Sequence, residues 1–432
     1  MTKTMNLFEK AEMVMLQKLT IFICFLLNIL DGMDVMVISY AAPAIAKEWA
    51  TTPQALGVVL SAGLLGMTVG TLFLAPRADI IGRRALILGC AALMGLVVFA
   101  TSTASSVNEL IFYRFISGLG IGGVLPISAA LTAEYAPKST KDFWVSFVMS
   151  GYPIGAVLSG FVAASVIPMY GWRTMFQFAG AATLLTLPFV YFFMSESLDF
   201  LLKKQPKNAL AQANVILGKM GQSSLADLPP IVAAKVEKTA ISSLFTPERK
   251  RSTLNLWLAL FLSFATMYYL LTWIPKLASA MGLPMNLAIY AGAVFNLGAV
   301  AGIWLQGYLS EKFGLRRIIF LFMALTALLM TLFTFFKGSA LVLVLFGFLG
   351  FAMQGGFVGL YAVAAAIYPT EIRSTGMGWA MGAGRVGAII SPILGGYLAG
   401  WGLSMTATFI IFAVPALLAG IATWRIDSKE IR

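Results

Sequence analysis

The sequence predicts an all-α integral membrane protein with twelve transmembrane helices in two pseudo-symmetric six-helix bundles. Of its 432 residues, 59% are hydrophobic and only 11% are charged, and the mean hydropathy is +0.87. Soluble globular proteins of this size do not have that balance. Apolar stretches long enough to cross a bilayer, which takes about 20 helical residues, recur along the whole chain. Short motifs of the first half also return in the second half at a constant separation.

Twelve apolar stretches make up most of the chain. They cover residues 19–42, 54–76, 85–103, 107–136, 143–167, 174–194, 253–279, 286–309, 318–336, 340–368, 377–400 and 404–424. The longest gap between them is polar and lysine-rich, and it divides the spans into six and six. The predicted organisation is a tail at 1–18, a bundle at 19–194, a central loop at 195–252, a second bundle at 253–424 and a tail at 425–432.

The distribution of lysine and arginine predicts the orientation. With the N-terminus in the cytoplasm, most basic residues outside the spans lie on the cytoplasmic side. The opposite side holds only Lys47, Arg173, Lys276 and Lys337. Because cytoplasmic loops carry the excess of Lys and Arg, both termini are expected inside. The net charge of +12 is therefore assigned to loops at one membrane face, and no nucleic-acid partner is expected.

Two carboxylates interrupt the first apolar stretch. One aspartate at the centre of a spanning helix costs about 2.5–3.5 kcal/mol, so Asp31 and Asp34 should face a protein interior or a water-filled cavity. Their i, i+3 spacing puts them on one helix face, and Asn28 lies one turn earlier on an adjoining part of it. Two nearby carboxylates do not both ionise easily in a low dielectric. The pair is therefore predicted to carry a proton, whereas apolar flanks disfavour a water-exposed helix end.

An internal repeat relates the two halves. Gly82 follows the second span within an acidic-Gly-basic loop, and Gly314 has the same place after the eighth. Residues 155–159 in the fifth span likewise match residues 387–391 in the eleventh, and both matches are 232 residues apart. Two bundles related by a repeat are the architecture of secondary transporters, whose substrate site lies between the halves near the midplane.

Five motifs resemble those of the major facilitator superfamily. They are the loops at 79–84 and 311–317, the run Arg114–Gly123, the Glu-Ser segment 196–201 with Ser195 where proline is usual, and the loop 368–376. Asp-Gly-x-Asp at 31–34 is similar to the aromatic acid:proton symporter family, which takes up benzoate-type and hydroxybenzoate-type acids in bacteria. The resemblance covers residues 15–425.

The resemblance implies a proton-coupled symporter of the bacterial inner membrane that imports a small aromatic carboxylate by alternating access. The proton is then the coupling ion, no cofactor or metal is needed, and the protein is expected to be a monomer in the lipid bilayer. Import of a sugar acid or an aliphatic monocarboxylate remains an alternative, and a drug-exporting antiporter is a weaker one. The chain contains no histidine, nucleophile–base pair or phosphate loop, which disfavours an enzyme.

The candidate site residues fall into three groups. Asp31, Asp34 and Glu134 are the proton-coupling candidates. Arg385 is a lone cation two turns inside the eleventh span, and a planar guanidinium can hold a carboxylate with two parallel hydrogen bonds. The other substrate-binding candidates are Arg114, Asn28, Tyr152, Asn296 and Gln354. The inner-gate candidates are Asp79, Arg83, Arg84, Glu311, Arg317, Glu371 and Arg373. The alternatives are snorkelling for Arg114 and helix packing for Arg385.

Overall fold

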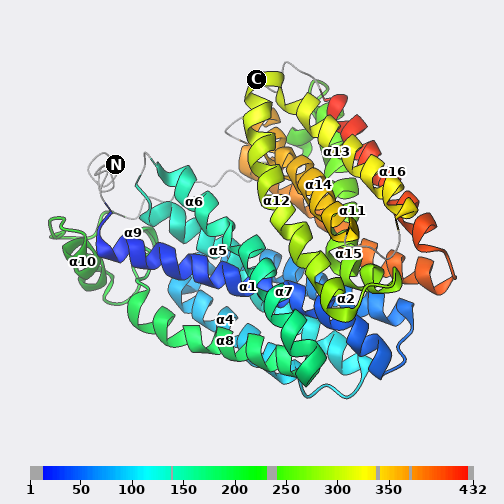
Figure 1. Ribbon diagram of the computed structural model, residues 1–432. Helices are drawn as coiled ribbons and strands as arrows, with labels where there is room; N and C mark the ends of the chain where they lie inside the picture. Colours follow the sequence, from blue (N-terminus) through cyan, green and yellow to red (C-terminus); the bar gives the residue numbers. More distant parts are fainter. Residues whose placement is uncertain (1–12, 138–139, 231–240, 337–340, 369–371, 427–432) are drawn as a thin grey trace. The chain divides into compact units, whose positions relative to one another are not determined.

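The computed structural model describes residues 13–137, 140–230, 241–336, 341–368 and 372–426, and all regular structure in these ranges is helical (Figure 1). The first half contains α1 (Met15–Glu48), α2 (Pro53–Phe73), α3 (Ala78–Ile81), α4 (Arg83–Thr101), α5 (Val107–Tyr135), α6 (Lys141–Met149), α7 (Gly151–Tyr170) and α8 (Trp172–Phe193). The second half contains α11 (Lys250–Ala280), α12 (Met285–Phe313), α13 (Leu315–Leu332), α14 (Leu341–Ile367), α15 (Arg373–Gly400) and α16 (Met405–Trp424).

Within the described part of the chain, eleven helical segments are long and apolar enough to cross a membrane. The fifth of them joins α6 and α7, which meet at Ser150. The predicted eleventh span is α15, which is 28 residues long but is not among the eleven, because Arg385 and many glycines lower its hydropathy. The predicted all-helical membrane fold is thereby confirmed.

The central loop is more ordered than its polar composition predicts. It carries α9 (Leu198–Lys204) and α10 (Ala209–Lys219), which the hydropathy pattern did not indicate because lysines and glutamines surround their few apolar residues. Leu201 and Leu217 of these helices are buried in an apolar cluster with side chains of α1, α4 and α5. The helices therefore form through tertiary packing rather than through membrane insertion.

The chain divides into two compact units. The first takes its described residues from Met1–Asp34, Leu65–Gly155 and Phe176–Val236, and the second from Val35–Leu64, Ala156–Met175 and Glu237–Arg432. The later part of α1 and the first part of α2 thus contact second-half helices within one unit. In that unit α11, α12 and α14 lie side by side, and each contacts the other two (Figure 1).

Close helix crossings recur with the 232-residue period. In the first unit a Cβ at Gly66 of α2 would collide with the carbonyl oxygen of Phe115 on α5. In the second unit a Cβ at Gly298 of α12 would collide with the carbonyl oxygen of Gly347 on α14. Only glycine lets two helix backbones approach so closely. Both partners of the first crossing lie 232 residues before those of the second, so the repeat seen in the sequence is a repeat of packing.

A second pair of crossings has the same period. Gly155 of α7 lies against the carbonyl of Ile29 on α1, and Gly387 of α15 lies against the carbonyl of Phe261 on α11. These are the glycines that the sequence comparison of the two halves had matched. These crossings place α7 against the part of α1 that carries Asp31 and Asp34. They also place α15, which carries Arg385, against α11.

Candidate functional site

A buried ion pair joins α1 to α5. The Arg114 Nη1 donates to Asp34 Oδ1 at 2.6 Å, and Nη2 donates to the backbone carbonyl of Asp34 at 3.1 Å. Both side chains are only 2% exposed. Arg114 is therefore held on α1 and does not snorkel to the membrane surface. The structure thus brings together a proton-coupling candidate, Asp34, and a substrate-binding candidate, Arg114.

Asp31 has a different environment from Asp34, although it lies only one turn earlier. Its side chain is fully buried, and neither carboxyl oxygen has a hydrogen-bond partner among the described residues. Asn28 is equally buried, and its Nδ2 donates to the carbonyl of Cys24 at 2.9 Å. The Asn28 Oδ1 has no partner in the described part of the chain. This stretch of α1 thus holds a buried amide oxygen and a buried carboxyl group that accept no hydrogen bond from any described residue.

Gly32 shapes the chain around these aspartates. A Cβ at Gly32 would collide with the carbonyl oxygen of Tyr152, so α7 lies directly against the Asp31–Asp34 turn. Tyr152 itself is half-buried. The predicted substrate-binding residues Asn28 and Tyr152 therefore lie next to the predicted proton-coupling residues, and one helix crossing positions both groups.

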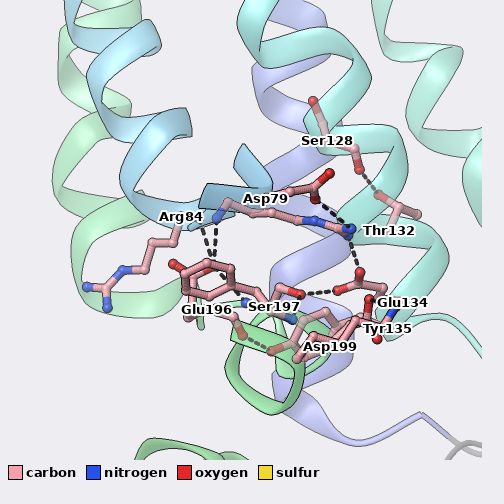
Figure 2. Close-up of polar contacts among 12 residues, drawn as sticks. Asp79, Arg84, Ser128, Thr132, Glu134, Tyr135, Glu196, Ser197 and Asp199 are labelled. Carbon is pink, nitrogen blue, oxygen red and sulfur yellow. Dashed lines mark hydrogen bonds and ion pairs between the residues drawn. The ribbon is translucent and has the colours of Figure 1, made fainter. Parts of the chain in front are cut away.

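Figure 2 shows a polar network at the ends of α4, α5 and α8 in the first unit. Arg83 is its centre. The guanidinium forms an ion pair with Glu134 through Nη1, and its Nη2 lies 3.9 Å from Asp79 Oδ1. Glu134 Oε2 also accepts a hydrogen bond from Ser197 Oγ at 2.5 Å. Since Glu134 is engaged on both oxygens, it belongs to this network rather than to the Asp31 and Asp34 cluster.

Glu196 holds the start of α4. Its Oε1 accepts from the backbone N–H groups of Arg83 at 2.8 Å and Arg84 at 3.2 Å, which are the first two residues of that helix. A carboxylate at a helix N-terminus satisfies free N–H groups and interacts favourably with the helix dipole. Gly82, with φ at +107°, leaves the space that this carboxylate occupies, because a Cβ there would meet Glu196 Oε2 at 2.5 Å.

Among the residues that the structure describes, the loop after α12 has no equivalent network. Leu315 stands 232 residues after Arg83, and Glu311 and Arg317 are exposed, with no ion pair to any described residue. Only the contact of Arg84, which donates to the carbonyl of Tyr191, has a counterpart, because Arg316 donates to the carbonyl of Trp424 at 3.3 Å. Of the remaining gate candidates, Glu371 and the side chain of Arg373 lie outside the described residues.

Arg385 is half-buried on α15 and forms no hydrogen bond or ion pair with the part of the chain that the structure describes. It lies within electrostatic range of Tyr361 on α14. The Tyr361 ring packs edge-on against Phe357 at 5.5 Å, and Phe357 packs edge-on against Phe264 of α11 at 4.7 Å. Tyr268, one turn after Phe264, stacks on it at 5.9 Å.

We call Phe264, Tyr268, Phe357 and Tyr361 the aromatic cluster. Its rings belong to α11 and α14, and the position before Arg385 is a glycine because a Cβ on Gly384 would overlap the Phe264 ring. The arrangement places an unengaged cation at the edge of an aromatic surface. Such a surface can stack an aromatic ring while the guanidinium binds an anionic group.

The two other substrate-binding candidates of the second half are buried, and neither forms a hydrogen bond with Arg385. Asn296 is 1% exposed and donates through Nδ2 to the carbonyl of Gly292, one turn earlier. Gln354, 8% exposed, lies on α14 one turn before Phe357. Nothing in these contacts assigns a ligand to Asn296.

Sequence reasoning assigned no role to five residues of these sites. Glu196 and Ser197 were recognised only as a motif, although their spacing before a helical segment could have indicated a cap. Phe264, Phe357 and Tyr361 were not singled out, because aromatic side chains are common in spanning helices. The i, i+4 spacing of Phe357 and Tyr361 on one face was the available signal.

Comparison with known proteins identifies the family. The model of the Major Facilitator Superfamily matches residues 24–306 and 256–431. The benzoate transport protein of Acinetobacter baylyi is 31% identical over 95% of this chain and 90% of its own length. The gallate transporter of Pseudomonas putida is 31% identical over 94% of this chain and 91% of its own length. In fold, the crystal structure of a D-xylose–proton symporter matches with a TM-score of 0.73 at 20% identity, over 96% of this chain and 98% of that one.

These matches cover nearly the whole chain, including every candidate residue above. They agree with the motifs in the loops and in the first span, and they establish a multi-pass membrane transporter that needs no cofactor rather than an enzyme. The chain belongs to the Major Facilitator Superfamily, within which its relatives include named transporters of aromatic acids.

Proposed function

We propose that this protein is a proton-coupled symporter that imports a small aromatic carboxylate, such as a benzoate or hydroxybenzoate, by alternating access. The observation that carries the proposal is Arg385, a half-buried guanidinium without a partner among the described residues, beside the aromatic cluster. A benzoate-type acid has the two features that this arrangement complements, a planar carboxylate and a ring. The names of the benzoate and gallate relatives support the same substrate class.

The proposed location is the inner membrane of a bacterium, with both termini in the cytoplasm and the protein acting as a monomer. The bacterial relatives support a location in the inner membrane of a bacterium. The excess of Lys and Arg in one set of loops supports the cytoplasmic position of both termini. In this orientation the network around Arg83 lies on the cytoplasmic side. Isolated surface ion pairs contribute little, but a network that forms in one conformation and breaks in the other biases a two-state equilibrium.

Uptake by proteoliposomes tests the proposal. Purified protein is reconstituted, and uptake of radiolabelled benzoate, 4-hydroxybenzoate, gluconate and lactate is measured with and without an inward proton gradient. We expect accumulation of the aromatic acids only, and only with the gradient. Accumulation of gluconate or lactate alone would favour the sugar-acid or monocarboxylate alternative and reject the aromatic substrate.

Arg385 is tested by ligand binding rather than by transport alone. Arg385→Lys keeps the charge but loses the planar fork, so the affinity for benzoate should fall about tenfold, equivalent to about 1.4 kcal/mol. Arg385→Ala should abolish detectable binding. Arg425→Ala, at the exposed end of α16, is the matched control and should bind as the wild type does. Wild-type affinity in Arg385→Ala would place the carboxylate partner elsewhere.

A further inference from the structure

We infer that the coupling proton resides on Asp31 and is held there by Asn28, while Asp34 stays ionised as the counter-ion of Arg114. This inference rests on the proposed proton-coupled function and assigns distinct roles to two aspartates that the sequence treats as equivalent. Asn28 becomes a positioning residue for the proton rather than a substrate ligand.

Asp34 differs from Asp31 in having a counter-ion, because the Arg114 guanidinium engages its Oδ1, whereas its Oδ2 has no partner among the described residues. Its Oδ1 accepts a charge-assisted hydrogen bond of 2.6 Å from Arg114, whose Nη2 also binds the Asp34 carbonyl. Protonating Asp34 would leave Arg114 as an uncompensated buried cation, which is strongly unfavourable. The pair therefore remains an ion pair while the chain keeps this arrangement.

Asp31 has no ion-pair partner among the described residues. Both of its oxygens and the Oδ1 of Asn28 are buried acceptors without a donor among the described residues. An isolated buried carboxylate is far more costly than its neutral acid. One added proton removes the buried charge of Asp31 and gives Asn28 Oδ1 a donor, because a neutral Asp31 carries an O–H group that Asn28 Oδ1 can accept.

The geometry of α1 favours this hydrogen bond. Residues three apart on a helix are neighbours, and helical side chains lean toward the N-terminus, so the Asp31 carboxyl leans toward Asn28. The Asn28 amide orientation follows from chemistry, because its Nδ2 donates to the carbonyl of Cys24 and a flipped amide would set two acceptors against each other. Oδ1 is therefore the atom that is turned away from Cys24.

Among the described residues, the titratable groups within electrostatic range of Asp31 are Asp34 on α1 and Cys90 on α4, and neither is a cation. Of the neighbouring helices, α5 carries Arg114, and α7 carries Tyr152, whose backbone carbonyl lies against Gly32. The Cys90 thiol lies within electrostatic range of the Asp31 carboxyl, and Arg114 is already paired with Asp34. Arg114 Nε–H is a buried donor without a partner among the described residues.

The step is a simple proton transfer. In the conformation open to the side of high proton concentration, a water-derived proton bonds to an Asp31 oxygen and Asn28 Oδ1 accepts its hydrogen bond. In the conformation open to the other side, the Asp31 O–H bond breaks, the proton goes to water and the electron pair stays on the carboxylate. No other co-reactant is required.

Two transport assays separate the roles. Benzoate counterflow, which exchanges internal for external substrate without a net proton movement, is compared with accumulation driven by a proton gradient. Asp31→Asn mimics the protonated acid, so driven accumulation should fall at least tenfold while counterflow persists at a reduced rate. Asp34→Asn leaves Arg114 unpaired and should lose both.

Asn28 is tested by the pH dependence of driven uptake. Asn28→Leu removes the acceptor, which favours loss of the proton, so the midpoint of uptake should move to lower pH by about one unit, the equivalent of one net hydrogen bond. Asn28→Ser keeps an acceptor oxygen and should restore part of the shift. A purely structural role for Asn28 would lower the rate at every pH and leave the midpoint unchanged.

Several outcomes would overturn the inference. Wild-type driven accumulation by Asp31→Asn, an unshifted midpoint in Asn28→Leu, or accumulation driven by a sodium gradient without a pH gradient would each do so. The last result would turn the same acceptors into a sodium site. A wild-type protein that exchanges no aromatic acid would instead reject the proposed substrate, so the two failures are distinguishable.

Discussion

Asp34 and Arg114 form an ion pair in which the guanidinium Nη1 lies 2.6 Å from the carboxylate Oδ1 and both side chains are 2% exposed. The two residues are 80 positions apart in the sequence, and the pair joins α1 to α5. Removal of one partner should be more harmful than removal of both, because a single variant leaves an uncompensated buried charge.

The first prediction follows from this pair. Arg114→Gln alone should destabilise the protein by about 3–5 kcal/mol, seen as a lower Tm in detergent. The double variant Asp34→Asn with Arg114→Gln should recover part of that loss, because two neutral amides can hydrogen-bond to each other. If the double variant is as unstable as the sum of the single variants, the charges are not coupled in the folded state.

The second prediction concerns the cap of α4. Glu196→Ala removes the acceptor of two backbone N–H groups, so it should cost about 1–2 kcal/mol of stability and loosen the contacts of Arg83. Cysteine labelling near Arg83 should become faster. Lys203→Ala, which breaks only an exposed i, i+4 pair, is the control and should change the Tm little. Equal labelling in both variants would separate Glu196 from the network.

The third prediction concerns a contact between the first and second halves within the second unit. Pro275 has no N–H, so the Leu271 carbonyl lacks its usual helical donor, and Ser39 Oγ of α1 donates to it at 2.9 Å. Ser39→Ala would leave this buried acceptor unpaired, at a cost of about 1–3 kcal/mol. The population of molecules in which α1 and α11 separate should then rise.

Distance measurements between spin labels on α1 and α11 would detect this shift. Ser39→Thr keeps the hydroxyl and should resemble the wild type. An identical distance distribution in Ser39→Ala would show that the hydrogen bond does not bias the transport cycle.

The fourth prediction concerns the repeated crossings. Gly66→Ala and Gly298→Ala each place a methyl group onto a backbone carbonyl, so both should reduce the yield of folded protein sharply. Gly89→Ala in α4, where a Cβ would meet nothing within 4 Å, is the matched control and should be neutral or slightly stabilising. Normal yield and Tm for Gly66→Ala would mean that the helices can move apart without loss.

The fifth prediction concerns the aromatic cluster. Phe357→Leu keeps apolar volume but removes the ring that packs edge-on against both Phe264 and Tyr361. Benzoate affinity, measured by calorimetry, should fall about two- to tenfold, the value of one aromatic pair. Phe335→Leu, at a 78% exposed position, should have no effect. Unchanged affinity in Phe357→Leu would move the ring site away from this cluster.

Several features could be predicted from the sequence because they depend on local composition and spacing. Hydropathy located the spans to within a few residues, as for 253–279 against α11, since insertion into a bilayer depends on the apolar content of each segment. The 232-residue period matched Gly155 with Gly387, and both glycines lie at equivalent crossings. The cost of charge in a membrane singled out Asp31, Asp34, Arg114 and Arg385 in advance.

Other features depended on neighbours that are distant in the sequence. α9 and α10 fold because Leu201 and Leu217 are covered by other helices, which local hydropathy does not record. The network around Arg83 has no counterpart around Leu315 in the described part of the chain, although the two loops share the family motif. Asp31 and Asp34 look equivalent as two acids one turn apart, and only the position of Arg114 distinguishes them. The sequence alone therefore determined which residues carry charge into the membrane, whereas the tertiary structure decided which of those charges are compensated, because compensation requires a partner within hydrogen-bond distance.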